Sequence, residues 1–183
     1  LGFVLSEGAG VLVLAAEEAI QAHGLRAKAE ILGVGWSSDA YHFAAPNRET
    51  IVRAMREAID DAALQPADLQ YVNTHGTSTV KGDSNEINCL KDVFGDRLAS
   101  LPISSNKSQL GHTLGAAAAI EGALTIEGMT RGILLPTMNH IPDAEFAGVD
   151  VIPNEPRRSS CELALSNAFG FGGTNCYIVL RGV

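Results

Sequence analysis

The chain has 183 residues, of which 46% are hydrophobic and 19% are charged, so it can bury a full core and has the composition of a soluble globular domain. Its formal net charge of −8 argues against a general nucleic-acid-binding surface. No apolar run reaches the roughly 18 uncharged residues of a membrane span, and residues 1–5 lack the basic region of a signal peptide. We therefore expect a cytoplasmic protein with no membrane and no nucleic-acid partner.

The first half of the chain alternates strand-like and helix-like segments. Residues 1–5 are expected to continue a strand, and a chain that begins inside an element is expected to be a fragment. Apolar runs and helical spacing predict a buried strand over 10–16, a helix over 16–23, a strand over 28–36, a helix over 48–64 and a short strand over 70–74.

The second half continues the alternation. Asp83 is expected to cap a helix over 84–94, with Glu86 completing a capping box. The other predicted elements are a strand over 101–105, a small-residue helix over 113–131, and two strands over 162–168 and 174–181. This order predicts one α/β domain over residues 1–183, with a sheet covered by helices on both faces.

Three cysteines, Cys89, Cys161 and Cys176, form no C-x-x-C pair and leave an odd count. This pattern suits a reducing compartment and argues against a disulfide framework or a zinc cluster. Cys89 falls at an apolar position of a predicted helix, and Cys176 alternates within a predicted strand. We therefore favour buried structural thiols over catalytic ones at these two positions.

His75 directly follows the predicted strand 70–74, at the sheet edge where α/β proteins hold their ligands. Thr77, Ser78 and Thr79 come next and offer three hydroxyl groups beside it. The pattern indicates a ligand site. The alternative is a core histidine that hydrogen-bonds to a backbone carbonyl and is followed by a polar turn.

His112 precedes the predicted helix 113–131. The positive end of a helix dipole disfavours the imidazolium form, so this imidazole is expected to stay neutral and to donate an N–H to a developing oxyanion. The alternative is a histidine that only caps the helix.

Lys107 and Glu121 flank His112 along the chain. They are candidates for a buried ion pair that orients the histidines, with a surface lysine and a solvated glutamate as the alternative. The many glycines and alanines around them allow close backbone approach, which favours the buried pair.

The turn 169–173, with Phe169, Phe171 and Gly172, is rich in glycine but is not followed by a helix, so it is a weak phosphate cradle. A tight loop whose backbone N–H groups face a site is the better interpretation. One of these N–H groups could supply half of an oxyanion hole, beside an aromatic ring that can swing.

Two neutral histidines and a backbone donor favour enolate or carbanion chemistry at a carbonyl. Metal-dependent hydrolysis would have to use His75, Asp83 and His112, which lack a tight ligand spacing. Serine hydrolysis lacks a G-x-S-x-G elbow. We therefore predict no metal site.

At these residues the sequence resembles the C-terminal half of β-ketoacyl-[acyl-carrier-protein] synthases, which are thiolase-fold condensing enzymes. The matching segments run in order along nearly the whole chain: 2–10, 37–42, 73–79 with Gly82, Asp83 and Glu86, then 107–112, 115–121 and 167–175. The resemblance implies an α/β, thiolase-like layered fold with a mixed sheet covered by helices.

The resemblance also implies roles for residues. His75 and His112 match the histidines that polarise the malonyl thioester and stabilise its enolate, and Lys107 matches the active-site lysine with Glu121 as its partner. The other matching positions are Asp83 and Glu86 as supporting residues, Thr77 and Thr79 as contacts of the phosphopantetheine arm, and Phe169, Phe171 and Gly172 as the gating loop with its oxyanion-hole N–H.

The function implied is decarboxylative condensation of malonyl and acyl thioesters carried by acyl carrier protein in fatty acid elongation, of the synthase II type. The family's nucleophilic cysteine lies in an N-terminal half that this sequence lacks, so the chain alone is expected to be inactive. The complete protein is expected to be a homodimer with no cofactor of its own. The alternatives are a polyketide ketosynthase and a non-catalytic partner subunit that resembles a chain-length factor.

Overall fold

The computed structural model describes residues 2–42 and 46–183. Its helices are α1 (Glu17–His23), α2 (Arg48–Asp61), α3 (Val80–Phe94), α4 (Lys107–Leu110) and α5 (Ala117–Arg131). Its strands are β1 (Ala29–Ser38), β2 (Tyr71–Asn73), β3 (Ile103–Ser104), β4 (Ile133–Leu134), β5 (Arg157–Arg158), β6 (Leu163–Gly170) and β7 (Thr174–Gly182). Short 3-10 turns occupy Pro66–Asp68, Gly95–Ala99, Leu114–Ala116 and Ala144–Phe146.

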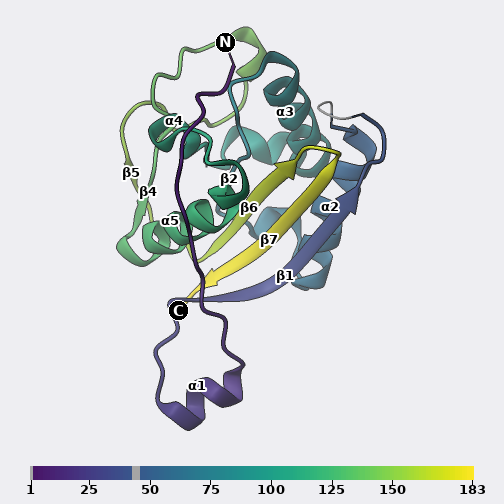
Figure 1. The fold of residues 1–183 in the computed structure, drawn as a ribbon. Coiled ribbons are helices and arrows are strands. Elements are labelled where there is room, and N and C mark those ends of the chain that lie inside the picture. Colours follow the sequence, from purple (N-terminus) through teal and green to yellow (C-terminus); the bar gives the residue numbers. More distant parts are fainter. Residues whose placement is uncertain (1, 43–45) are drawn as a thin grey trace.

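Five strands form one mixed sheet in the order β1-β7-β6-β2-β3, and β4 pairs with β5 in a separate ribbon (Figure 1). β1 and β6 each run antiparallel to β7, whereas β6, β2 and β3 run parallel to one another. The carboxyl ends of the three parallel strands therefore meet at one edge of the sheet, which is where such sheets hold ligands.

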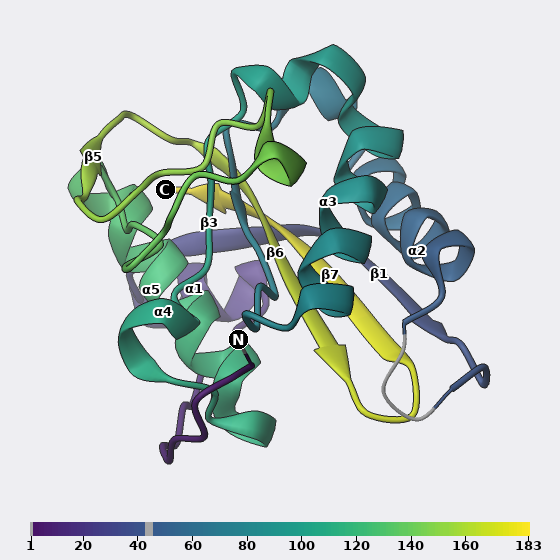
Figure 2. The same ribbon diagram turned by 90° about the horizontal axis from the view of Figure 1, so that it is seen from above.

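Helices cover both faces of this sheet, as the α/β prediction required. Alternation along the strands directs Val72 and Tyr177 into a core with α2 and α3, and directs Tyr71 and Leu180 into a second core with Met129 of α5. Figure 2 shows α2 and α3 on one side of the strands and α5 on the other. Among the described residues, no helix is both long and apolar enough to span a membrane.

Two glycines let α2 lie close against the edge strand β1. A Cβ atom at Gly33 would lie 2.3 Å from the Ala58 carbonyl oxygen, and one at Gly35 would lie 1.9 Å from the Ala54 carbonyl oxygen. Neither distance is compatible with a side chain, so glycine is required at both positions for this helix–strand contact.

The predicted buried strand over 10–16 is wrong. These residues are extended but pair with no described strand, and Val11 and Val13 are 86% and 90% exposed. The segment runs beside α5 toward α1, which extends away from the sheet (Figure 1). Of residues 2–5, Leu5 alone forms a β-bridge, with His112. The apolar composition of residues 10–16 suggested a strand, but the described chain has no strand that pairs with this segment.

The predicted cap at Asp83 is also wrong, because α3 begins at Val80 and Thr79 occupies its N-cap position. Asp83 therefore lies inside the first turn, and Glu86 does not complete a capping box. The predicted helix 113–131 starts as a 3-10 turn, and α5 itself begins only at Ala117. The short helix α4 was not predicted.

Candidate active site

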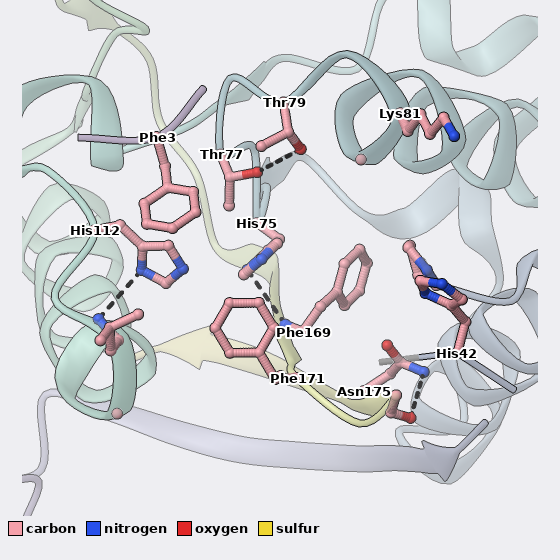
Figure 3. A pocket seen from close by; sticks show the side chains of 16 residues that line it. Phe3, His42, His75, Thr77, Thr79, Lys81, His112, Phe169, Phe171 and Asn175 are labelled. Carbon is pink, nitrogen blue, oxygen red and sulfur yellow. Dashed lines mark hydrogen bonds between the residues drawn. The ribbon is translucent and has the colours of Figure 1, made fainter. Parts of the chain in front are cut away.

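The ends of the parallel strands bring the predicted residues together. His75 follows β2, Phe169 lies at the end of β6, and the loop after β3 leads through Lys107 to His112. The two histidine rings meet edge to face with centroids 5.6 Å apart (Figure 3). Residues more than 90 positions apart in sequence therefore surround one site.

His75 is held by the backbone of β6. Its Nδ1 accepts a hydrogen bond from the Phe169 N–H at 3.3 Å, and the Phe169 ring packs on the imidazole at 4.9 Å between centroids. Burial, with smaller contributions from Lys107 and His112, lowers the pKa of His75 to about 2. Because Nδ1 is an acceptor, the proton of the neutral ring is on Nε2, which is free to donate.

His112 is arranged in the same way. Its Nδ1 accepts from the Leu114 N–H at 3.2 Å, and its backbone is fixed by Val4 and Ser6, which exchange hydrogen bonds with the His112 N–H and carbonyl. Burial, then the charge of Lys107, lowers the pKa of His112. The neutral state was expected from the dipole of a following long helix, but α5 starts five residues later, so burial and Lys107 are the better cause.

Lys107 and Glu121 form the buried ion pair, at 2.6 Å between Nζ and Oε1, with side chains 5% and 3% exposed. Asn73 Nδ2 also donates to the Glu121 carboxylate, at 3.4 Å. Burial raises the pKa of Glu121, and Lys107 and Asn73 oppose that shift. The alternative of a surface lysine and a solvated glutamate is excluded by this geometry.

Glu86 and Asp83 hold the loop that carries His75. The Glu86 carboxylate accepts the backbone N–H groups of His75 and Gly76, each at 2.8 Å, and an Asp83 oxygen accepts that of Thr77 at 3.1 Å. Burial, followed by repulsion from Glu86, raises the pKa of Asp83 to about 6. Both carboxylates thus support the site by bonding to a loop, rather than by capping a helix.

A pocket of about 390 Å³ opens in front of the two histidines. Thr77 and Thr79 line it, with their hydroxyl oxygens 3.0 Å apart, as do Phe169 and Phe171 (Figure 3). Gly172 is not among the lining residues and lies at φ +85° in the turn beyond them. The pocket has the apolar lining with a few polar groups that is typical of small-molecule sites.

The comparisons with known proteins agree with this geometry. Residues 28–140 match the family described as "Beta-ketoacyl synthase, C-terminal domain". The chain belongs to the β-ketoacyl synthase family. It is 43% identical over 183 aligned residues to 3-oxoacyl-[acyl-carrier-protein] synthase 2 of Staphylococcus aureus, covering 98% of this chain and 45% of that protein. It is 42% identical over 182 residues to Nodulation protein E of Rhizobium meliloti, covering 100% of this chain and 45% of that protein.

Solved ketosynthase structures share the fold. The ishigamide ketosynthase/chain length factor superposes with a TM-score of 0.94 at 37% identity, over 100% of this chain and 45% of that one. A β-ketoacyl synthase from Burkholderia phymatum STM815 superposes with a TM-score of 0.85 at 43% identity, over 91% of this chain and 40% of that one. The thiolase-like α/β prediction is confirmed. The chain spans a little under half the length of these synthases.

Phe3 is a site residue that sequence reasoning missed. Its ring packs edge-on against His112 at 5.3 Å between centroids, and it lines the pocket. The Gly2 N–H donates to the Ser78 carbonyl, so residues 2–6 link the His75 loop to the His112 loop. The match of residues 2–10 to the synthase family was the available signal, but it pointed to the segment and not to this ring.

Asp39 is a second missed residue. Its carboxylate accepts hydrogen bonds from Asn175 Nδ2 at 2.7 Å, from the Asn47 N–H at 2.8 Å and from the Thr50 hydroxyl. The backbone N–H of Asp39 donates to the Gly173 carbonyl. Asp39 therefore ties the 171–173 turn beside the pocket to the start of α2. It lies within the family match over 37–42.

The cysteines take no part in the pocket. None of the described lining residues is a cysteine, and Cys89 and Cys161 are buried in the two cores. Burial raises the pKa of Cys89 to about 12 and that of Cys161 to about 11, so neither thiol is activated. Over residues 2–42 and 46–183, no three His, Cys, Asp or Glu side chains are grouped to hold a metal ion.

Proposed function

We propose that this chain supplies the enolate-forming part of a 3-oxoacyl-[acyl-carrier-protein] synthase that elongates fatty acids. A malonyl thioester enters the pocket and its carbon–carboxylate bond breaks, which releases CO2. The electron pair passes into the thioester carbonyl and gives an enolate. The enolate carbon then attacks an acyl thioester on a cysteine, a carbon–carbon bond forms, and the thiolate leaves.

One observation carries this proposal, namely the paired orientation of His75 and His112. Each Nδ1 accepts a backbone N–H, at 3.3 Å and 3.2 Å, so each Nε2 carries the proton of a neutral ring. Both rings line the same pocket. Two such donors stabilise the negative charge that develops on the carbonyl oxygen, which is worth about 3–4 kcal/mol per donor in comparable sites.

Lys107 acts on this pair without being a donor to substrate. Its ammonium is bound to Glu121 and is buried beside both imidazoles, and its charge lowers the pKa of each. It thereby keeps the rings in the neutral form that can donate to an oxyanion. The intact set of His75, Lys107 and His112 argues against a non-catalytic chain-length-factor-like partner.

We further propose that the acyl-accepting cysteine is none of the three in this sequence, since none lines the described pocket. The substrates are malonyl and acyl groups on the phosphopantetheine arm of acyl carrier protein, with Thr77 and Thr79 contacting the arm. A solved neighbour at 34% identity is a type II polyketide ketosynthase in complex with its acyl-carrier protein, which supports this partner. The complete enzyme would be a cytoplasmic homodimer with no cofactor of its own.

A polyketide ketosynthase is the second candidate. Two structural neighbours favour it. The ishigamide ketosynthase/chain length factor has a TM-score of 0.94, and the type II polyketide ketosynthase in complex with its acyl-carrier protein has a TM-score of 0.93. The 43% identity to synthase 2 of Staphylococcus aureus, against 37% and 34% for those two neighbours, favours fatty acid elongation.

The test is a condensation assay with malonyl and saturated acyl carrier protein. We expect no β-ketoacyl product from this chain alone, and product when the chain is joined to the cysteine-bearing half of a relative. Product from the isolated chain would contradict the assignment of the nucleophile. Failure of the joined protein to accept saturated acyl groups, with turnover of poly-β-ketoacyl groups, would favour the polyketide alternative.

A further inference from the structure

Lys81 lies at the mouth of the pocket and has no role in the mechanism described above. It is the second residue of α3, and it lines the pocket together with His42 and Pro46. In Figure 3, Lys81 and His42 lie on the side away from His112, and Thr77 and Thr79 lie between Lys81 and His112, next to His75. Lys81 therefore marks the end of the pocket opposite the reacting groups.

Lys81 brings to this mouth a charge that no described acidic side chain pairs with. It has no hydrogen bond and no ion pair within the described part of the chain. Asp83 is two positions further along α3, a spacing that does not place side chains on the same helix face, and its carboxylate accepts the Thr77 N–H. Lys107, the other lysine near the histidines, is already paired with Glu121.

The two catalytic histidines of this pocket add no positive charge of their own. Burial lowers the pKa of both His75 and His112, so they are neutral rings. The other lining groups are mainly aromatic rings, threonine hydroxyls and glycines. Among the described lining residues other than His42, Lys81 is thus the single cation, and it lies where a ligand must pass to reach the histidines.

We propose that the Lys81 ammonium binds the phosphate of the phosphopantetheine arm. This inference rests on the proposed function, which places the thioester end of the arm at His75 and His112 and its middle at Thr77 and Thr79. The phosphate is the anionic group at the opposite end of the arm. A flexible lysine at the mouth suits it, because a lysine ammonium binds phosphate as a point charge without fixed geometry.

Binding of two small probes tests this contact. The probes are pantetheine, which lacks the phosphate, and 4′-phosphopantetheine. We expect the protein to bind 4′-phosphopantetheine about threefold to fivefold more tightly, as for an exposed ion pair. The difference should shrink between ionic strengths of about 0.01 M and about 0.15 M, because the contact is exposed to solvent.

Variants locate the contact. Lys81→Gln should remove the preference for the phosphate, and Lys81→Arg should restore most of it. Lys91→Gln is the matched control, because Lys91 is on the same helix but bonds to the Glu145 carbonyl, away from the pocket. It should leave the affinities for both probes unchanged.

The outcomes separate this inference from the proposed function. If pantetheine itself fails to bind near His75, as seen in the histidine NMR signals, the proposed function is overturned. If both probes bind equally well to the wild type, the function stands and the Lys81 contact is overturned. The phosphate contact of Lys81 would also be overturned if the Lys81→Gln variant kept the preference for the phosphate but bound acyl carrier protein less well. That result would favour a contact between Lys81 and acidic side chains of the carrier.

Discussion

At the scale of single residues, the site depends on which nitrogen of each histidine carries the proton. Both histidines were visible in the sequence, because one follows a predicted strand and the other precedes a small-residue segment. The neutral state of His112 was expected from a helix dipole, whereas burial and the charge of Lys107 lower the pKa values of both histidines. Sequence reasoning could not find the backbone donors Phe169 and Leu114, since these depend on loop geometry that spacing does not reveal. Phe3 escaped for the same reason, as it reaches His112 only through the packing of the N-terminal segment.

The carboxyl group of Asp83 gives a residue-scale prediction. Burial and the neighbouring Glu86 raise its pKa to about 6, well above the ordinary value of an aspartate. A carboxyl titration followed by carbon NMR should show one aspartate with a midpoint near that value, and the signal should be missing in Asp83→Asn. Because the folded-state pKa is above the unfolded value, ionised Asp83 destabilises the fold above about pH 6, and that penalty disappears as the pH falls toward about 4. A midpoint below about 4 would contradict the burial of this group.

At the scale of elements, the sequence predicted the sheet and most helices because their apolar spacing is regular. α2 and β7 lie close to their predicted ranges. Apart from the strand expected over 10–16 and the unpredicted helix α4, the errors lie at the ends of elements, where side chains compete for other partners. Asp83 has the composition of a cap, but its carboxylate bonds to the backbone of the preceding loop, and α3 starts three residues before it.

The ion pair between α4 and α5 gives an element-scale prediction. Lys107→Met leaves the Glu121 carboxylate buried without a counter-charge, so it should lower the free energy of unfolding by about 3–5 kcal/mol. The double variant Lys107→Met/Glu121→Gln should lose clearly less free energy of unfolding than Lys107→Met, because no buried charge remains. Urea unfolding measures both.

The control for that pair is the exposed ion pair of Arg53 and Glu57, whose side chains are 61% and 50% exposed. Arg53→Met should change the free energy of unfolding by no more than about 0.5 kcal/mol. Equal losses for Lys107→Met and the double variant would show that the stability comes from packing of the lysine stem and not from charge pairing.

At the scale of the whole molecule, the least expected feature is the exposed apolar segment over residues 10–16. Composition alone predicted burial, and the described chain lacks a strand that could cover it. Val11 and Val13 are nearly fully exposed, while Leu12 lies in ordinary contact distance of the Gly122 position on α5. An extended, unpaired, apolar segment of this kind is prone to pair with another copy.

This exposure predicts self-association. The protein should form larger species as its concentration rises in analytical ultracentrifugation, and Val11→Lys/Val13→Lys should reduce that association because charges on an exposed strand oppose pairing. Ile141→Lys is the control, since Ile141 is 82% exposed but lies in another loop. If the control reduces association as much as the double variant, the segment is not responsible.

If His75 and His112 donate to an enolate oxygen, their loss should affect one half-reaction more than the other. In the chain joined to the cysteine-bearing half of a relative, release of CO2 from malonyl carrier protein and acyl transfer to the cysteine are measured for wild type and His112→Ala. We predict that CO2 release falls by about 100-fold to 1,000-fold, the usual effect of removing one oxyanion donor, while acyl transfer is partly retained. Equal loss of both steps would contradict the enolate role.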